Sequence, residues 1–388
     1  MAFPSFSRAI RIFLFVTLQL SFLSSVCGQN TAKTAVGARF ADSDINDQKK
    51  NAEWFLRGRV VPGKSAAELR RRAYQMKMRA RTARAQNAPS NSAQPTSSNV
   101  WMPLGPVPLA SDATGDGFQD YHQVSGRATA VAIDPADPTG NTVYIGGAQG
   151  GIWKSENAAT SGNNVTWAPL TDDQPTLSIG AIAIQPGNTN PNASVILAAT
   201  GEADNAADSY FGLGILQSTD AGNTWMLVST ANSGAYSFSG LGGTRMAFST
   251  TNTSTVVAAM ATTNVGIVDG ALTVNSYAGL YTSTNAGQSW TYDALSPAGA
   301  SEATSATSVV YNAAAGLFFA VVRYQGFFSS PDGLTWTRLA AQPGAPGLLS
   351  TAACPQNYVT TCPIYRGEIT VVPGRNGNVC LVYFARRE

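Results

Sequence analysis

The stretch Ser218–Trp225 (STDAGNTW) has the residues of a tight hairpin between two apolar runs. The Asp220 carboxylate can accept hydrogen bonds from the backbone of the turn, and Gly222 permits a positive φ. Ser218 can tie the ends of the turn together, and the Trp225 ring can pack between strands. The stretch therefore predicts a β-hairpin whose polar groups serve the turn itself and no chemistry.

Two further stretches repeat this pattern, at Ser283–Trp290 (STNAGQSW) and at Ser329–Trp336 (SSPDGLTW). Asn285 replaces the aspartate in the first of these, and Asp332 is shifted by one residue in the second. A degenerate version spans residues 155–167. The residues to which we assign a structural role in the three clear hairpins are Ser218, Asp220, Gly222, Trp225, Ser283, Asn285, Gly287, Trp290, Asp332, Gly333 and Trp336.

Around these hairpins the chain repeats a unit of four short apolar runs separated by turn residues. The four units span Ala128–Leu170, Ile179–Val228, Gly243–Tyr292 and Thr307–Leu339. Four strands in a repeat of roughly 40–65 residues are typical of propeller blades. The sequence thus predicts an all-β fold, a β-propeller of four-stranded antiparallel blades, with about four blades complete and one incomplete.

The three hairpins resemble the Asp-box, or bacterial neuraminidase repeat. This repeat occurs in sialidases, sortilin-type propellers, photosystem II assembly-factor propellers and xyloglucanase-type glycosidases. The resemblance covers most of residues 125–340. It implies a β-propeller in which the box is structural and lies away from the active face.

The connections between predicted strands differ in length on the two faces of the blades. In an antiparallel blade the first-to-second and third-to-fourth turns share one face, and the other connections share the opposite face. The hairpins are third-to-fourth turns, whereas the long segments Gly201–Phe211 and Thr262–Ala278 join second strands to third strands. Because variable loops commonly carry function, we expect a glycan or protein ligand on the face opposite the hairpins.

The loop Gly201–Phe211 is the richest in chemistry on that face. Paired carboxylates can supply the acid and the base or nucleophile of a glycosidase, next to aromatic rings on which a sugar packs. The same groups suit a calcium site, and they also fit an ordinary solvated loop whose aromatic rings pack the insertion. The candidates are the catalytic carboxylates Glu202, Asp204 and Asp208, and the ligand-binding residues Arg127, Tyr210 and Phe211.

Several features argue against catalysis. The resemblance to sialidases would imply an arginine cluster, a tyrosine nucleophile with its glutamate, and an acid, whereas the arginines after residue 100 are few and scattered. His122 is the only histidine, which excludes a zinc cluster built on histidines. No nucleophile elbow or phosphate-binding glycine loop occurs. We therefore expect a binding or interaction scaffold, and the alternative is a glycoside hydrolase of the sialidase or xyloglucanase type.

A second candidate calcium loop precedes the first unit. Its oxygen ligands would be Asp112, Asp116 and Asp120, and Gly117 stands at the sixth position, as in a calcium-binding loop. Gln123 takes the place of the bidentate glutamate at the twelfth position. Calcium is thus the one cofactor that the sequence suggests, and an ordinary turn-rich loop is the alternative.

Charge divides the chain of 388 residues into two parts. Residues 1–100 hold 16 basic and 5 acidic residues, whereas residues 101–388 hold 9 basic and 18 acidic ones. Residues 101–388 therefore carry a net negative charge, which repels the phosphate backbone of a nucleic acid. We expect no nucleic-acid partner. The predicted parts are a signal peptide at 1–28, a basic segment at 29–85 with a helix at about 65–84, a polar linker at 86–100 and the propeller at 101–388.

The N-terminal signal and the basic helix bear on location. Two arginines precede an apolar run at 12–23, and small residues lead to Gly28, which predicts a cleaved secretory signal too short to span a membrane. We expect a secreted, periplasmic or cell-envelope protein without a transmembrane span after cleavage. The helix begins with the capping box Ser65–Glu68, and it fits either an electrostatic arm for an acidic surface or a solvated leader.

The C-terminal part predicts a further, incomplete blade. Residues 368–372 and 379–383 fit first and second strands, and Trp101–Leu104 resembles a fourth strand that would close the last blade. We therefore expect a propeller that is incomplete at its C-terminus. Export permits disulfides, and Cys354 and Cys362 can close a small loop, with Cys380 left as a buried apolar side chain.

Overall fold

The structure of the protein is a computed structural model of the whole chain, and part of the chain is described. The described residues are 66–86, 109–110, 123–124, 126–160, 164–203, 209–263, 277–296, 305–323, 325–340, 342, 367–371 and 379–380. The chain divides into the units Met1–Lys50 and Asn51–Glu388, and every described residue belongs to the second. The expected signal peptide and the cysteines Cys354 and Cys362 lie outside the described residues. Of the helices in these ranges, none has the length and hydropathy needed to cross a membrane.

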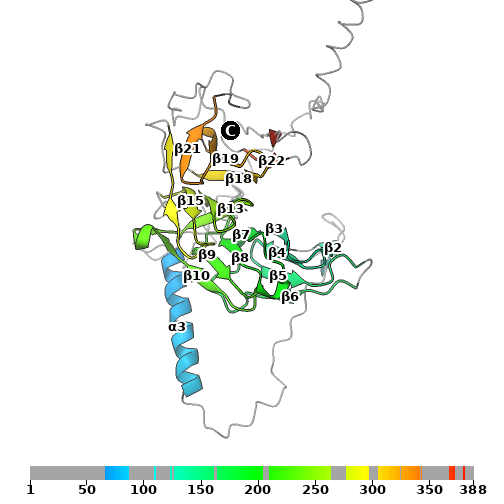
Figure 1. Cartoon of the computed structure of the whole chain (residues 1–388). Coiled ribbons are helices and arrows are strands. Elements are labelled where there is room, and N and C mark those ends of the chain that lie inside the picture. The colour runs from blue at the N-terminus through cyan, green and yellow to red at the C-terminus, as the bar shows by residue number, and fades with distance from the viewer. Residues whose placement is uncertain are drawn as a thin grey trace, which may run out of the picture. The chain divides into compact units, whose positions relative to one another are not determined.

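Within these ranges the chain forms four larger sheets, each with four antiparallel strands that follow one another in sequence, which confirms the four predicted units (Figure 1). Sheet 1 contains β3 (Ala128–Ile133), β4 (Val143–Gly147), β5 (Gly151–Ser155) and β6 (Ala168–Pro169). Sheet 2 contains β7 (Ile179–Ile184), β8 (Ile196–Thr200), β9 (Ile215–Ser218) and β10 (Met226–Val228). Sheet 3 contains β13 (Leu241–Phe248), β14 (Val256–Thr262), β15 (Gly279–Ser283) and β16 (Thr291–Tyr292). Sheet 4 contains β18 (Ala306–Asn312), β19 (Leu317–Val322), β20 (Gly326–Ser330) and β21 (Thr335–Arg338).

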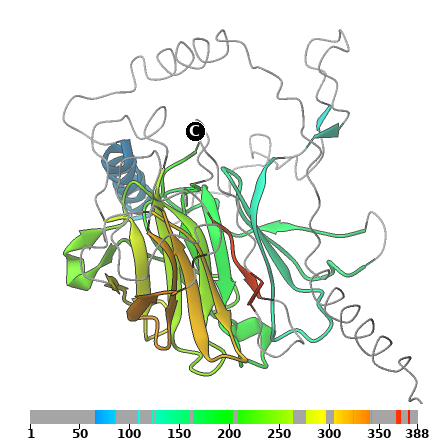
Figure 2. The ribbon, with the colours of Figure 1, turned by 90° about the horizontal axis from the view of Figure 1, so that it is seen from above.

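The sheets pack on one another through their first strands. Strand β3 packs on β7, β7 on β13, and β13 on β18. Figure 2 shows the strands of the neighbouring yellow and orange sheets running side by side. Successive four-stranded sheets that meet along their first strands are the blades of a β-propeller, so the predicted fold class is confirmed.

The core lies between neighbouring sheets. Separate apolar clusters join sheet 1 to sheet 2, sheet 2 to sheet 3, and sheet 3 to sheet 4. Because both faces of an inner sheet are covered, its strands are apolar along their whole length instead of alternating. Strand β14 is the clearest case, since Val256 to Ala261 are all buried.

A bulge interrupts the first strand of each of the four sheets, and in three of them the side chain at the bulge reaches the next first strand or the residues before it. The pairing with the second strand skips one residue in each case, namely Thr129, Gly180, Thr244 and Thr307. The Thr244 hydroxyl donates to the Ala306 carbonyl of sheet 4 at 2.9 Å. Thr129 donates in the same way to the Ile179 carbonyl of sheet 2. A bulge turns a side chain out of the ladder, and here that side chain satisfies a carbonyl of the neighbouring blade.

The hairpins between third and fourth strands share one hydrogen-bond pattern. The amide before each tryptophan donates to the Asp or Asn side chain, as Thr224 N does to Asp220 Oδ1 at 2.8 Å. The same bond is made by Ser289 to Asn285, by Thr335 to Asp332, and by Thr166 to Asn157 in the degenerate first copy. The polar residues of these turns thus serve the turn backbone.

The fourth hairpin differs from the alignment that the sequence suggested. Ser330, and not Ser329, donates to Asp332 Oδ1, at 3.0 Å, as Ser218 does to Asp220 at 2.8 Å. The aspartate is therefore not shifted relative to its serine. Instead the turn is one residue shorter, because Thr335 follows Asp332 by three positions where Thr224 follows Asp220 by four.

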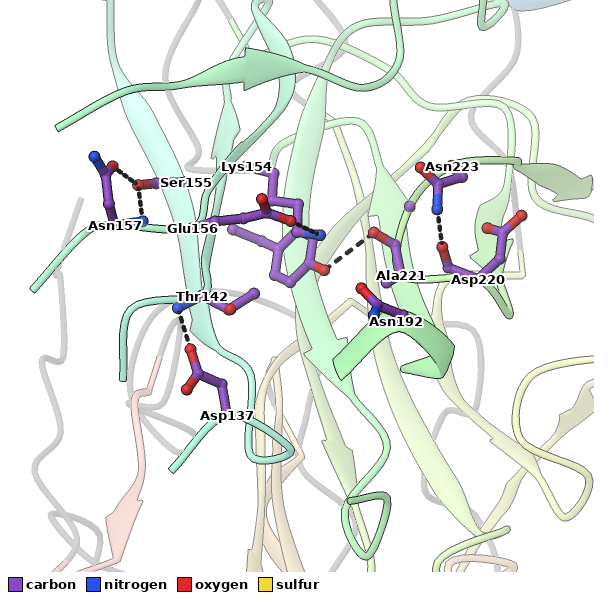
Figure 3. Close-up of polar contacts among 12 residues, drawn as sticks. Asp137, Thr142, Lys154, Ser155, Glu156, Asn157, Asn192, Asp220, Ala221 and Asn223 are labelled. Carbon is purple, nitrogen blue, oxygen red and sulfur yellow. Dashed lines mark hydrogen bonds and ion pairs between the residues drawn. The ribbon is translucent and has the colours of Figure 1, made fainter. Parts of the chain in front are cut away.

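The hairpins of sheets 2, 3 and 4 also pack against the preceding sheet, and a side chain of that sheet donates to a carbonyl of the turn. The Tyr144 hydroxyl donates to Ala221 O at 3.1 Å, a bond whose acceptor is labelled in Figure 3. Gln217 Nε2 donates to Ala286 O at 2.7 Å, and the Thr282 hydroxyl to Gly333 O at 2.6 Å. The hairpins are thus the second set of contacts between neighbouring sheets.

Several short elements surround the four sheets. Strand β17 (Ala294–Ser296) runs parallel to β21 and covers the outer edge of sheet 4. The pair β22 (Thr370–Val371) and β23 (Val379–Cys380) confirms the expected fifth set of first and second strands. The remaining elements are α3 (Ala66–Gln86), β1 (Leu109–Ala110), β2 (Gln123–Val124), η1 (Pro191–Ala193), β11 (Thr230–Ala231), η2 (Asn232–Gly234) and β12 (Tyr236–Ser237).

Asp293 is a buried acid at the junction of sheets 3 and 4. Its Oδ2 lies 2.8 Å from the Thr282 hydroxyl and 3.2 Å from Trp336 Nε1, whereas its Oδ1 has no hydrogen-bond partner. Burial raises the pKa of Asp293 well above its ordinary value of 3.8, and the charge of Asp332 adds to the rise, against the two hydrogen bonds. The folded protein therefore holds this carboxyl neutral where the unfolded chain ionises it.

We expect Asp293→Asn to stabilise the fold at pH 8 by about 1–3 kcal/mol, because an amide needs no proton to stay neutral. A carboxyl whose pKa is raised on folding makes its full contribution to the free energy of unfolding below its ordinary pKa. That contribution is lost as the pH rises through the pKa of the folded state. The gain should therefore vanish near pH 3.8 and grow with pH, as measured by urea unfolding. Asp137→Asn is the control of opposite sign: hydrogen bonds from Thr139 and Thr142 lower the pKa of Asp137. A gain for Asp293→Asn that does not change with pH would contradict the assignment.

The fit of a hairpin against the preceding sheet can be tested at Gly287. Its φ is +91°, and a Cβ there would overlap the methyl groups of the buried Leu197. Gly234 has a similar φ of +98° but open space around it, so it is a matched control for backbone strain. We expect Gly287→Ala to lower the free energy of unfolding by about 1–3 kcal/mol more than Gly234→Ala, through overpacking. Equal losses in denaturant unfolding would show that the contact between the sheets is loose.

Candidate functional site

The side chains of Arg127 and Glu202 meet on the face opposite the hairpins. Arg127 precedes β3, and Glu202 follows β8. Arg127 Nη2 lies 2.6 Å from Glu202 Oε1, although 75 residues separate them in the chain. The Glu202 side chain is 1% exposed, and that of Arg127 is 41% exposed. The two candidates therefore form one half-open ion pair.

Backbone contacts fix both partners at a junction of blades. Ala148 N donates to Arg127 O at 2.9 Å, which joins the start of β3 to the turn after β4. Glu202 N donates to Tyr210 O at 2.9 Å, and the Glu202 backbone forms a parallel bridge with Gly243 of sheet 3. Glu202 thus lies where sheets 1, 2 and 3 meet, on the face where the connection lengths predicted a site.

This geometry decides what Glu202 can do. A general acid or nucleophile must reach the substrate at hydrogen-bond distance, whereas this carboxylate is buried and bound to a guanidinium. The arrangement favours a tie between blades that holds Arg127 in place. The other two catalytic candidates, Asp204 and Asp208, lie outside the described residues.

A cavity of about 830 Å³ adjoins Arg127. Its polar lining includes Arg127 and Gln149, and the rings of Trp153 and Trp167 supply its aromatic walls. Trp153 Nε1 donates to Gly150 O at 2.8 Å, which fixes the indole. The size of the cavity falls within the roughly 300–1,000 Å³ of ligand sites. Gly147 at the end of β4 and Ala148 and Gly150 of the turn after it line the cavity with little or no side chain, and these small residues are the signal in the sequence that would have pointed to it.

The cavity lies on a face of sheet 1 that no other described sheet covers. Val131 pairs in register with Ile145, and Ile145 with Trp153, so these three side chains share one face. Val131 is 68% and Ile133 62% exposed. The positions that correspond to Val131 and Ile133 in the later sheets, counted from the bulge, are covered by the preceding sheet and include Met246, Phe248 and Val309. Sheet 1 therefore presents an apolar face beside Arg127.

Tyr210 and Phe211 serve a different contact. Their rings stack at 4.9 Å, and Phe211 is 2% exposed in a cluster with Leu213 and Ala67 of α3. Arg70 of α3 lies 4.9 Å from the centre of the Tyr210 ring. The structure thus places both aromatic candidates under the start of α3, which is the packing role that the sequence left open for them.

The calcium candidates Asp112, Asp116 and Asp120 lie outside the described residues. In the part of the chain that the structure describes, no three His, Cys, Asp or Glu side chains gather in a way that could hold a metal ion.

Arg127→Ala is expected to destabilise the fold more than Glu202→Gln, because it leaves a buried carboxylate without its cation, whereas the half-exposed arginine can be solvated. With allowance for the exposure of Arg127, we expect a loss of about 1–3 kcal/mol. The exposed pair Arg245–Glu368, at 3.3 Å, is the matched control, and Arg245→Ala should cost under about 1 kcal/mol. Urea unfolding at pH 7 measures all three, and equal losses would exclude a special role for the Arg127–Glu202 pair.

Comparison with known proteins shows similarity only at the level of structure. No family model matches the chain, and no curated protein does. An ancestral GH74 enzyme is similar at 23% identity over 56% of this chain and 24% of that chain, with a TM-score of 0.41. The GH74 xyloglucanase from Xanthomonas campestris is similar at 17% identity over 66% and 35%, with a TM-score of 0.42. PorZ, a surface component of the type-IX secretion system of Porphyromonas gingivalis, is similar at 13% identity over 60% and 31%, with a TM-score of 0.37. The chain thus spans between about a quarter and about a third of the length of these three structures.

Proposed function

We propose that this chain is an exported propeller of the Asp-box type that acts as a binding scaffold, with a glycan as its ligand. The shared hydrogen-bond pattern of the four hairpins supports the Asp-box assignment. The apolar run at 12–23 after two arginines, from which we predict a secretory signal, supports export. The observation that carries the binding proposal is the cavity beside Arg127, on the uncovered face of sheet 1.

The lining of that cavity suits an acidic oligosaccharide. The faces of Trp153 and Trp167 can pack against the C–H groups of a sugar ring, and aromatic rings contribute large contact areas. The half-exposed Arg127 can bind a carboxylate, for which the planar guanidinium is the preferred partner. Gln149 adds an amide that can both donate and accept.

Binding is favoured over hydrolysis by the state of Glu202. Glycosidases need two carboxyl groups on opposite sides of the scissile bond, and the one described candidate is buried in an ion pair with Arg127. Glu202 then acts by orienting the arginine and not by proton transfer.

The proposal predicts that oligogalacturonides bind and that neutral oligosaccharides of equal length bind at least about tenfold more weakly. Trp153→Ala should weaken binding at least about tenfold, as expected for an aromatic anchor in a pocket. Met226→Ala is the matched control, because Met226 is 54% exposed on sheet 2, away from the cavity lining. Isothermal titration measures affinity, and chromatography of the same samples detects cleavage products. Equal affinity for wild type and Trp153→Ala would remove the cavity as the site, and cleavage would establish the hydrolase alternative.

A further inference from the structure

Helix α3 is anchored to the sheets only at its start. Ala67 is 1% exposed and packs with Phe211 and Leu213, and Arg70 covers the Tyr210 ring. Tyr74 is half-buried, and all nine side chains from residue 75 to residue 83 are exposed. The later part of α3 therefore has no packing partner among the residues that the structure describes.

The same part of the helix is strongly basic. Glu68 is the only acidic residue of α3 and lies in its first turn. Lys77, Arg79 and Arg81 have no acidic partner within ion-pair distance in the described ranges. Lys77 and Arg81 are one helical turn apart, and like charges at this spacing destabilise a helix. A helix that is polar on all sides and lacks i,i+4 pairs of opposite charge gains little stability of its own. An anionic partner would supply the negative charge that the described residues do not place beside this part of α3.

The distribution of the charges favours a polymer over a flat surface. At 100° per residue, Lys77 and Arg81 lie about 40° apart around the axis, while Arg79 points about 160–200° away from them. A membrane surface can contact only one side of such a helix, whereas a flexible chain can follow several. The exposed residues Met76 and Met78 also lie on opposite sides, so α3 has no apolar stripe that could enter a bilayer.

The net negative charge of residues 101–388 is a second reason to favour a polymer over a flat surface. Residues 101–388 hold 18 acidic and 9 basic residues and so are repelled by an extended anionic surface. Residues 75–86 extend about 16 Å along the helix axis, which is about twice the Debye length of about 8 Å in physiological salt. A linear polyanion can bind this segment at a distance where the charge of residues 101–388 is screened.

We propose that the exposed part of α3 binds a linear anionic polysaccharide through Lys77, Arg79 and Arg81. This site shares no residue with the cavity beside Arg127, so it goes beyond the proposed function and does not depend on it. Because recognition rests on charge, affinity falls steeply with ionic strength and tolerates a change between arginine and lysine.

The test uses the full chain and immobilised polygalacturonate at 50 and 150 mM salt, with neutral dextran as the blank. The variant Lys77→Ala/Arg79→Ala/Arg81→Ala removes three charges with a residue of high helix propensity. It should lose at least about tenfold in affinity at 150 mM salt. The variant Arg79→Lys/Arg81→Lys keeps the charges and should bind like the wild type. The control Gln75→Ala/Met76→Ala/Met78→Ala alters the same exposed segment without removing charge and should leave binding unchanged.

Trp153→Ala separates this site from the cavity, because it should leave binding to the polymer through α3 intact, and unfolding curves verify that each variant is folded. Vesicles with 30% phosphatidylserine and a 20-base-pair DNA duplex serve as competing probes. An affinity for either that exceeds the affinity for polygalacturonate would overturn the choice of partner. The α3 variants are also measured in the Trp153→Ala background, where the cavity contributes little. Polygalacturonate binding that the triple alanine variant retains in that background, or that the control Gln75→Ala/Met76→Ala/Met78→Ala abolishes, would overturn the proposal itself.

Discussion

The hydroxyl of a bulged threonine is the interaction on which the succession of sheets depends. In three of the four sheets the bulge of the first strand carries a threonine, and its side chain donates to a carbonyl of the next first strand. The third of these bonds runs from Thr307 to Gly367 O, at 2.9 Å, and so reaches the strand region of β22. The first strands of neighbouring sheets pack closely, which leaves little space for side chains between them. A threonine hydroxyl at a bulge is small enough to fit there, and it can donate to a carbonyl of the neighbouring sheet. In sheet 2 the same position is Gly180, where a Cβ would overlap Gly243 O.

The hairpins provide the complementary contact at the other end of the blades. Their side-chain oxygens are used within the turn, which leaves turn carbonyls such as Ala221 O and Ala286 O for donors of the preceding sheet. Each blade is thus held at its bulge and at its hairpin. The face opposite the hairpins is then free to differ between blades, and that is where Arg127 and Glu202 meet, with the cavity beside Arg127 on the uncovered face of sheet 1.

Much of the fold could be predicted from the sequence because its signals are local. Strands β3 and β7 begin at the first residues of the first two predicted units, and β13 and β18 begin within two residues of the start of theirs, since each is an apolar run closed by turn residues. The three-residue strand β17 was not foreseen, because its parallel pairing with β21 depends on the fold of the following blade. The site was predictable only in part: Arg127 and Glu202 were both named, but their contact joins residues far apart in the chain. Trp153 falls within the first predicted unit but is not among the predicted site residues, because nothing local shows that its face of sheet 1 is uncovered.

Strand β17 has a consequence for how the protein unfolds. The segment that leaves sheet 3 lies along the outer strand of sheet 4, and its residues Ala294 to Ser296 pair with Thr335 to Thr337. In a repeat protein whose units contact only their neighbours, the coupling between adjacent units sets how sharply the array melts. Because β17 follows sheet 3 in the chain and pairs with a strand of sheet 4, it raises that coupling. These two blades are therefore expected to unfold in a single cooperative step.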